Sequence, residues 1–289
     1  FPDPHHPWDP PQSELDRVDW RDLDLPPGYP GSSERTADIL RDKPRHWLEW
    51  FEGRGQFNFE VPADLVPAQL TADQIREVNA MVHVENELID EAVERVMGHI
   101  DGLGWGEDTD VFYTTDHGEF QGDFGMLFKG PYHVEGLMHL PFIWRPAPSA
   151  GVTPAEIDAP VGHVDLAPTI CAAAGLVVPE WMQGAPLPTS VEDGKGRERT
   201  ITEWQDGYAG NDIVMRTLYR DGYICTAYEK TNYYDDGVGE LYNLAEDPAQ
   251  WRNLWDDPAQ QSLKSDLIAD LYDNLPEGRD EPLEKVAQV

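Results

Sequence analysis

A short apolar run that ends in an acid and a histidine is the feature that most limits what this chain can fold into. Residues 111–115 are all β-branched or aromatic, and Asp116, His117 and Gly118 follow at once. Such a run predicts a buried parallel strand, and open α/β sheets bind ligands just beyond the carboxyl ends of these strands. Asp116 offers carboxylate oxygens, His117 offers a ring nitrogen, and we expect Gly118 to let the backbone turn sharply beside a bound ion. The sequence thus predicts a site for a metal or an anionic substrate.

The tripeptide Asp-His-Gly is also common in loops, and by itself it favours an ordinary turn. The next residues favour a site, because glycines recur at positions 122, 125 and 130 and Lys129 lies among them beside aromatic residues. The chain has only 6 Lys against 15 Arg. A lysine in such a loop is therefore less expected to serve solubility alone, and its compact charge suits an oxyanion.

The segment Thr114–Glu119, followed by Gly122-Asp123, Lys129-Gly130 and Glu135, resembles the second half of the sulfatase family, within the alkaline-phosphatase-like superfamily. The resemblance implies an α/β fold: part of a doubly wound sheet, then a small antiparallel sheet with a last helix. It implies a catalytic portion over residues 1–190 and a C-terminal subdomain over residues 191–289.

The first residues are rich in proline, which predicts an extended loop, and the adjacent His5 and His6 could belong to a surface loop or a tag remnant. The resemblance suggests a sharper interpretation, because sulfatases carry a Pro-His-x-Pro element in mid-chain whose first His contacts the sulfate. Residues 4–7 match that element, so His5 takes this role. Residue 1 would then correspond to the middle of the family sequence, and a missing upstream half would carry the nucleophile and two aspartate metal ligands.

Neither cysteine carries the motif of the sulfatase nucleophile. Cys171 and Cys225 both lie in apolar runs and are expected to be small buried hydrophobic residues. Neither has the Cys-x-Pro-x-Arg surroundings from which sulfatases make formylglycine, and no Ser-x-Pro-x-Arg occurs. We therefore expect formylglycine only in the missing N-terminal part.

The resemblance assigns chemistry to four residues. A sulfate monoester is anionic, so its hydrolysis needs a divalent cation, further positive charge and a proton donor for the leaving oxygen. Asp116 and His117 would bind the metal, Lys129 would bridge sulfate and leaving group, and His5 would contact the sulfate or donate the proton. The resemblance favours Ca²⁺, while the nitrogen of His117 leaves Mn²⁺ or Mg²⁺ open.

The charge balance limits the partners. The chain has 55 acidic and 21 basic residues, for a net charge of −34, which argues against nucleic acid and anionic membrane surfaces. It has no run of about 18 apolar residues, so no transmembrane helix is expected. We expect a small-molecule or carbohydrate sulfate ester as partner, a cytoplasmic location, and a chain compatible with a homo-oligomer.

Local patterns predict the other elements. Thr71–Gln74 is a capping box that starts a long amphipathic helix, interrupted on its apolar face at Glu85 and ended by glycines at 102 and 104. A helix broken at Pro44 is expected over residues 34–50. Strands are expected over 140–145, 213–220 and 223–229 with a turn at Asp221-Gly222, and a last helix over 260–274.

Two other functions stay open from the sequence. A phosphonate or phosphate ester hydrolase of the same superfamily has a similar arrangement of Asp-His and Lys. A truncated, non-catalytic fragment, or an acidic structural domain with weak cation binding, is the alternative of a different class.

Overall fold

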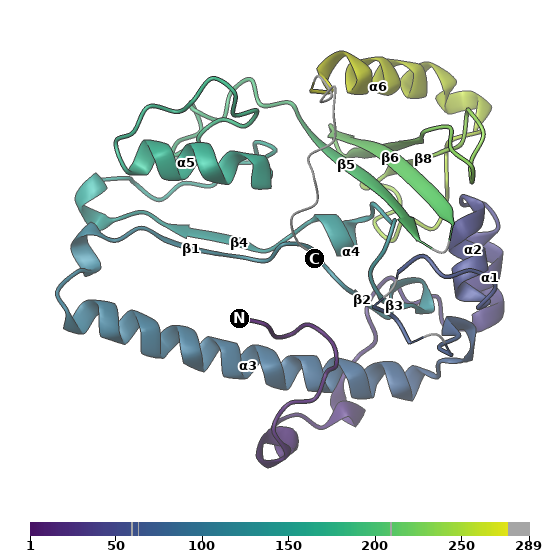
Figure 1. Ribbon diagram of the computed structural model, residues 1–289, viewed down its shortest axis with the longest axis horizontal. Helices are drawn as coiled ribbons and strands as arrows, with labels where there is room; N and C mark the ends of the chain where they lie inside the picture. Colours follow the sequence, from purple (N-terminus) through teal and green to yellow (C-terminus); the bar gives the residue numbers. More distant parts are fainter. Residues whose placement is uncertain (59, 63, 209, 277–289) are drawn as a thin grey trace.

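The computed structural model describes residues 1–58, 60–62, 64–208 and 210–276 (Figure 1). Helix α3 (Ala72–Gly102) runs along one side, and a four-stranded sheet with helix α6 (Gln261–Asn274) lies at one end of the molecule. Within those ranges we find no helix with the length and apolarity that crossing a bilayer requires.

Helix α3 begins as its sequence predicts. The Thr71 hydroxyl accepts from the Gln74 N–H (3.2 Å), and the Gln74 side chain accepts from the Thr71 N–H (2.9 Å), so both halves of the capping box form. The predicted apolar face is buried only as far as Ile89, and Val96 further along the helix is 55% exposed. Glu85, expected to interrupt that face, is itself buried, with only 4% of its surface exposed.

Strand β1 (Val111–Thr114) is not part of a parallel sheet, which corrects the sequence prediction. It pairs antiparallel with β4 (Phe142–Arg145), with Val111 opposite Arg145, and every strand pair among the described residues is antiparallel. The intervening segment folds back, so that Phe142 lies opposite Thr114. Neither strand contains a fully buried residue, and Ile143 is 61% exposed. The doubly wound sheet is therefore not formed within these residues.

The C-terminal sheet confirms the antiparallel part of the prediction. Its strand order is β5 (Arg199–Tyr208), β6 (Asn211–Arg220), β7 (Tyr223–Tyr228) and β8 (Gly239–Asn243). Strand β5 was not predicted. At the β6–β7 turn both Asp221 (φ 53°) and Gly222 (φ 78°) have positive φ, as a tight hairpin turn requires. Helix α6 supplies the buried Leu267 and Leu271 to the small apolar core that it shares with this sheet (Figure 1).

The main core is aromatic. Helices α1 (Ser33–Leu40) and α2 (Arg45–Phe51) are separated at Pro44, as predicted, and they pack near the short ribbon of β2 (Phe120–Gln121) and β3 (Leu127–Phe128). Trp47 is completely buried, and its ring centroid lies 4.4 Å from that of Tyr132 and 5.0 Å from that of Phe124. Trp50 is also buried and belongs to the same core.

A buried lysine joins this core to the C-terminal sheet. The Lys43 ammonium donates to the Tyr242 hydroxyl and to the Gln250 carbonyl oxygen (2.7 Å), and lies 3.7 Å from the Glu240 carboxylate. Burial lowers the pKa of Lys43 to about 8, and the negative charge of Glu240 opposes that change. Removing one partner of such a buried pair typically costs about 3–5 kcal/mol, because the other charge is left without compensation.

The remaining elements are short. Helix α4 (Glu135–Met138) follows the β2–β3 ribbon, and helix α5 (Leu166–Ala173) follows Asp165, whose buried carboxylate accepts from Arg197 (2.9 Å). Cys225 is buried as expected, whereas Cys171 is only partly buried, and neither forms a disulfide. Short 3-10 helices cover Gln12–Arg17, Trp20–Asp22, Pro67–Gln69, Gly106–Asp108, Asp123–Gly125, Pro148–Ala150, His163–Asp165 and Pro258–Gln260.

Two histidines are buried and neutral in the core. His46 donates from Nε2 to the Pro131 carbonyl oxygen (2.9 Å) and accepts at Nδ1 from the Tyr234 hydroxyl (2.7 Å). Burial lowers the pKa of His46 to about 3 and that of His133 to about 4, from an ordinary value of 6.5. Below pH 6.5 the two histidines therefore bind protons in the unfolded chain but stay unprotonated in the folded chain.

We predict that His46→Gln reduces the dependence of stability on acid pH. Each histidine lowers the free energy of unfolding by up to about 1.4 kcal/mol for every pH unit below 6.5. The stability difference between wild type and H46Q should therefore shrink as pH falls from 7 to 5 in urea unfolding. The exposed His163 provides the control, since H163Q should give a curve parallel to that of wild type. A parallel curve for H46Q would contradict the prediction.

Candidate functional site

The loop after strand β1 presents Asp116 and His117 to solvent. The Asp116 side chain is 86% exposed, and its Oδ2 lies 3.8 Å from His117 Nε2. The other ring nitrogen, Nδ1, donates to the Gly118 carbonyl oxygen (2.9 Å), so Nε2 of the neutral ring keeps its lone pair. Partial burial by itself would raise the pKa of Asp116. The positive charge of His117 when its ring is protonated, together with hydrogen bonds from the His117 N–H and the Thr115 hydroxyl, outweighs that effect and lowers the pKa.

This donor pair fits part of a metal site. A carboxylate oxygen and an imidazole nitrogen whose tautomer is set by a backbone carbonyl are ordinary ligands for divalent cations. Among the residues that the structure describes, no third histidine, cysteine or carboxylate joins Asp116 and His117 in a close group. These two residues can hold one side of an ion whose full shell needs further ligands.

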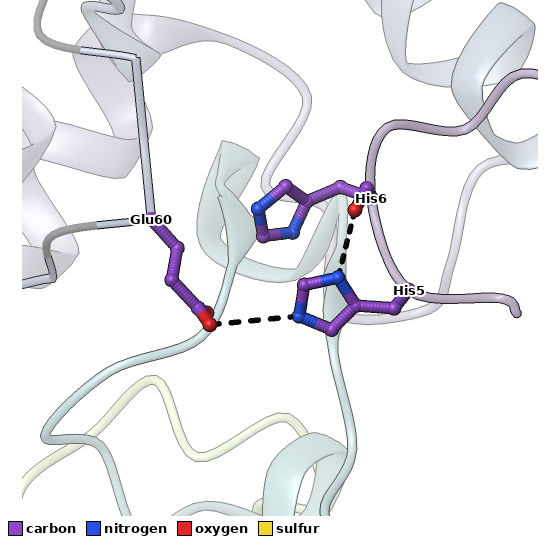
Figure 2. A group of neighbouring side chains, drawn as sticks. All are labelled: His5, His6 and Glu60. Carbon is purple, nitrogen blue, oxygen red and sulfur yellow. Dashed lines mark hydrogen bonds and ion pairs between the residues drawn. The ribbon is translucent and has the colours of Figure 1, made fainter. Parts of the chain in front are cut away.

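Lys129 and His5 meet at a second position. Lys129 Nζ lies 2.9 Å from His5 Nε2, although the two residues are 124 positions apart in the chain. His5 Nδ1 donates to the His6 carbonyl oxygen at 2.7 Å, because a carbonyl can only accept (Figure 2). Nε2 of the neutral ring therefore accepts from the lysine. The structure thus brings together two of the residues that the sequence selected.

Two carboxylates complete this cluster. Glu60 lies 3.0 Å from Lys129 Nζ and 3.6 Å from His5 Nε2, and Glu119 lies 3.7 Å from Lys129 Nζ. Burial opposes ionisation of Glu60, but its hydrogen bond with Lys129 and the nearby positive charges lower its pKa. Burial raises the pKa of Glu119, which the charges of Lys129, His117 and His5 only partly offset. The positive charges that act on Glu119 thus come both from His117 and from the Lys129 cluster.

Sequence reasoning did not select Glu60 and gave Glu119 no role. Glu119 stood inside the motif, directly after Gly118, but nothing in the sequence showed that it faces a lysine ten positions later. The only local sign for Glu60 was a single acid just before the apolar Val61. Its partners come from distant parts of the chain.

The ligand atoms of His5, His6 and Glu60 lie within 4.8 Å of one another, which is the spacing of a loose metal site (Figure 2). The Lys129 ammonium, however, already contacts both His5 and Glu60. A second cation among these groups would face strong repulsion from the lysine. The cluster is therefore better suited to an anion, which can displace a carboxylate from Lys129, than to a metal.

Backbone strain and aromatic packing position Lys129. The preceding residue, Phe128, has a φ of 71°, an unfavourable region for a bulky side chain. Its ring is buried, with its centroid 4.9 Å from that of Trp8 and 5.0 Å from that of His6. This packing fastens the N-terminal segment beside Lys129 and holds His5 within reach of the ammonium.

Gly118 is needed for a different reason from the one predicted. Its φ is not among the positive values, so the expected sharp turn is not what requires glycine. A Cβ atom at this position would lie 2.1 Å from the Gly136 carbonyl oxygen and 2.8 Å from Leu137 Cα. The Gly118 N–H donates to the Leu137 carbonyl oxygen (2.9 Å), so the absence of a side chain lets the Asp116–His117 loop lie directly on helix α4.

Solved structures identify the fold. The chain is similar to phosphonate monoester hydrolases from Silicibacter pomeroyi (TM-score 0.76, 22% identity, 93% of this chain and 53% of that chain) and Agrobacterium radiobacter (TM-score 0.75, 18% identity, 94% and 55%). These similarities define an alkaline-phosphatase-like fold.

Family models identify the family. The sulfatase model matches residues 23–176, and the model for the C-terminal part of N-sulphoglucosamine sulphohydrolase matches residues 122–276. Each match covers more than half of the chain, and the protein belongs to the sulfatase family.

Curated relatives agree with the family. The chain is 26% identical to the uncharacterized sulfatase YidJ of Escherichia coli, over 97% of this chain and 50% of that protein. It is 25% identical to a Δ4,5-hexuronate-2-O-sulfatase of Bacteroides thetaiotaomicron, over 68% of this chain and 40% of that protein. The chain thus spans about half the length of the relatives it matches, or less.

We predict that Gly118→Ala destabilises the fold by about 1–3 kcal/mol, because the added methyl group must displace backbone of helix α4. Gly98 within helix α3 provides a matched control, since a Cβ there meets nothing within 4 Å. Gly98→Ala should be neutral or stabilising by up to about 1 kcal/mol. Thermal unfolding of both variants tests this, and equal melting temperatures would contradict the close contact.

Proposed function

We propose that this chain contributes the sulfuryl-binding groups and part of the metal site of a sulfuric ester hydrolase. The observation that carries the proposal is the contact of Lys129 Nζ with His5 Nε2 at 2.9 Å, since both groups were assigned to sulfate independently of the structure. Membership of the sulfatase family supports it.

The chemistry of a sulfate ester matches this pair. The Lys129 ammonium has three donors and can contact a sulfuryl oxygen and the leaving oxygen together, which stabilises the negative charge that develops there. His5 reaches the same point with Nε2, which contacts the sulfate or, when the ring is protonated, donates a proton to the leaving oxygen. Glu60 lies 3.6 Å from the same nitrogen.

Asp116 and His117 would hold one divalent cation, which we propose to be Ca²⁺, with Mn²⁺ and Mg²⁺ as alternatives. When bound, such an ion neutralises charge on sulfuryl oxygens. The chain's own part is the orientation of its two donors: the Gly118 carbonyl holds the His117 ring, and the His117 N–H holds the Asp116 carboxylate (3.0 Å).

Neither cysteine has the surroundings of a nucleophile. Cys225 is completely buried, and burial raises the pKa of its thiol to about 12, which keeps it protonated. Cys171 lies in helix α5 without the required motif. The proposal of sulfate ester hydrolysis therefore rests on the family. The residues of this chain themselves support binding of the sulfate ester.

For the substrate we propose a carbohydrate sulfate ester. Relatives named for their substrates include a Δ4,5-hexuronate-2-O-sulfatase and an N-acetylglucosamine-6-O-sulfatase. Phosphonate esters form the second candidate class, because the two phosphonate monoester hydrolases match this fold with TM-scores of 0.75 and 0.76. A phosphonate monoester presents the same kind of oxyanion to Lys129 and His5.

We predict that Lys129→Ala weakens binding of inorganic sulfate by about tenfold or more, as loss of a charge-assisted hydrogen bond does. His5→Ala should weaken it less, because a neutral ring carries no charge. Titration calorimetry at constant ionic strength measures both. Lys195→Ala is the control, since this lysine is 67% exposed and pairs only with Glu192 among the described residues. Unchanged affinity in K129A would remove the lysine from the site.

We predict that Asp116→Asn weakens Ca²⁺ binding by about tenfold or more, because it removes a charged oxygen ligand. We expect the many surface acids to bind Ca²⁺ weakly, so Asp235→Asn at an exposed aspartate serves as the control for that background. Calorimetric titrations with Ca²⁺, Mn²⁺ and Mg²⁺ rank the ions. Identical Ca²⁺ curves for D116N and D235N would contradict the assignment of Asp116.

A further inference from the structure

Glu60 occupies the position where an anionic ligand would compete for Lys129. Its carboxylate lies 3.0 Å from the Lys129 ammonium. It also lies 3.6 Å from His5 Nε2 (Figure 2). Lys129 and His5 are the two groups that the proposed function gives to the sulfuryl group. Its side chain is 27% exposed, so it borders the site and remains open to a ligand. A carboxylate at this place needs an explanation, because by itself it repels a sulfate ester.

Hydrogen bonds and packing hold Glu60 in this position. The Asn58 side-chain amide donates to the Lys129 carbonyl oxygen (3.1 Å), and its oxygen accepts from the Glu60 N–H (2.8 Å). The same side chain therefore links the backbone of the lysine to that of the glutamate. Phe57 and Val61 on either side are buried in the aromatic core. The pairing of Glu60 with Lys129 is thus fixed by the fold and differs from an adventitious surface ion pair.

The local charges show what kind of ligand this arrangement suits. Lys129 faces two carboxylates, Glu60 and Glu119. A sulfuryl group that takes the lysine's hydrogen bonds leaves Glu60 beside an anion and with fewer partners of its own. A ligand that carries both an anion for Lys129 and a cation for Glu60 avoids this repulsion, because each charge then meets its opposite.

We propose that Glu60 is a specificity-determining residue that selects sulfate esters whose leaving group carries an ammonium group close to the ester oxygen. The substrate class is the sulfate esters of vicinal amino alcohols, a class that includes sulfated amino sugars. In such a ligand the sulfuryl group binds Lys129 and His5 while the ammonium binds the Glu60 carboxylate. This inference rests on the proposed sulfuryl site and adds Glu60 as the residue that recognises the leaving group.

Two small probes test the selection by binding alone. 2-Aminoethyl sulfate and 2-hydroxyethyl sulfate differ only in an ammonium or a hydroxyl group two carbons from the ester oxygen. NMR titration of the 289-residue chain gives their dissociation constants. Wild type should bind the ammonium probe about fivefold more tightly or better, the scale of a partly exposed charge pair.

Glu60→Gln keeps the shape of the side chain and removes its charge. E60Q should lose the preference, by binding the ammonium probe more weakly and the hydroxyl probe more tightly than wild type does. Glu192→Gln, at a glutamate that is 78% exposed, is the matched control and should keep the preference. Thermal unfolding of both variants checks that the fold is retained.

The outcomes separate this inference from the proposed function. Equal wild-type affinities for the two probes, a preference that survives in E60Q, or no measurable binding of the ammonium probe would each overturn the role of Glu60. If Lys129→Ala still abolishes binding of the hydroxyl probe or of inorganic sulfate, the sulfuryl site stands without that role. If K129A leaves the affinity for every anion unchanged, the sulfuryl site fails and the inference fails with it.

Discussion

The buried ammonium of Lys43 connects the parts of this protein on which the candidate site depends. It binds the Gln250 carbonyl oxygen (2.7 Å), and the Gln250 side chain accepts from the N–H of Glu135, the first residue of helix α4 (2.7 Å). Helix α4 in turn receives the Gly118 N–H at the Leu137 carbonyl oxygen (2.9 Å). The Asp116–His117 loop is thereby tied to the core through a buried charge, whose loss would leave Glu240 uncompensated.

The site itself depends on a local arrangement of positive charge in an acidic protein. With a net charge of −34, the chain repels anions at long range, so any affinity for a sulfate ester must come from direct contacts. Lys129 supplies them, but it is shared among His5, Glu60 and Glu119. A lysine with several close partners has a defined position. A ligand that binds it must make up for the hydrogen bonds and ion pairs that it displaces. Because ligands compete with these partners, we expect Lys129 to bind some anions much better than others.

The comparison of sequence with structure separates local signals from long-range ones. The capping box at Thr71, the break at Pro44 and the hairpin at Asp221-Gly222 depend on a few adjacent residues, and all three were predicted correctly. The apolar run at Val111 predicted a strand but not its partner, because periodicity contains no information on pairing direction. The sequence predicted a glycine requirement at position 118 but attributed it to a sharp turn. The actual cause is the close contact with Gly136, which a local sequence pattern cannot show.

By itself, the sequence determined the family, the helices and hairpin that local chemistry specifies, and the residue types with which an oxyanion or a metal could be bound. Only the tertiary structure decided that strand β1 pairs antiparallel with β4 and that His5 meets Lys129 across 124 positions. Only the tertiary structure placed Glu60 against the same lysine. The physical reason is that capping and turn formation are set within a few residues, whereas the charges that surround a side chain depend on how distant segments pack.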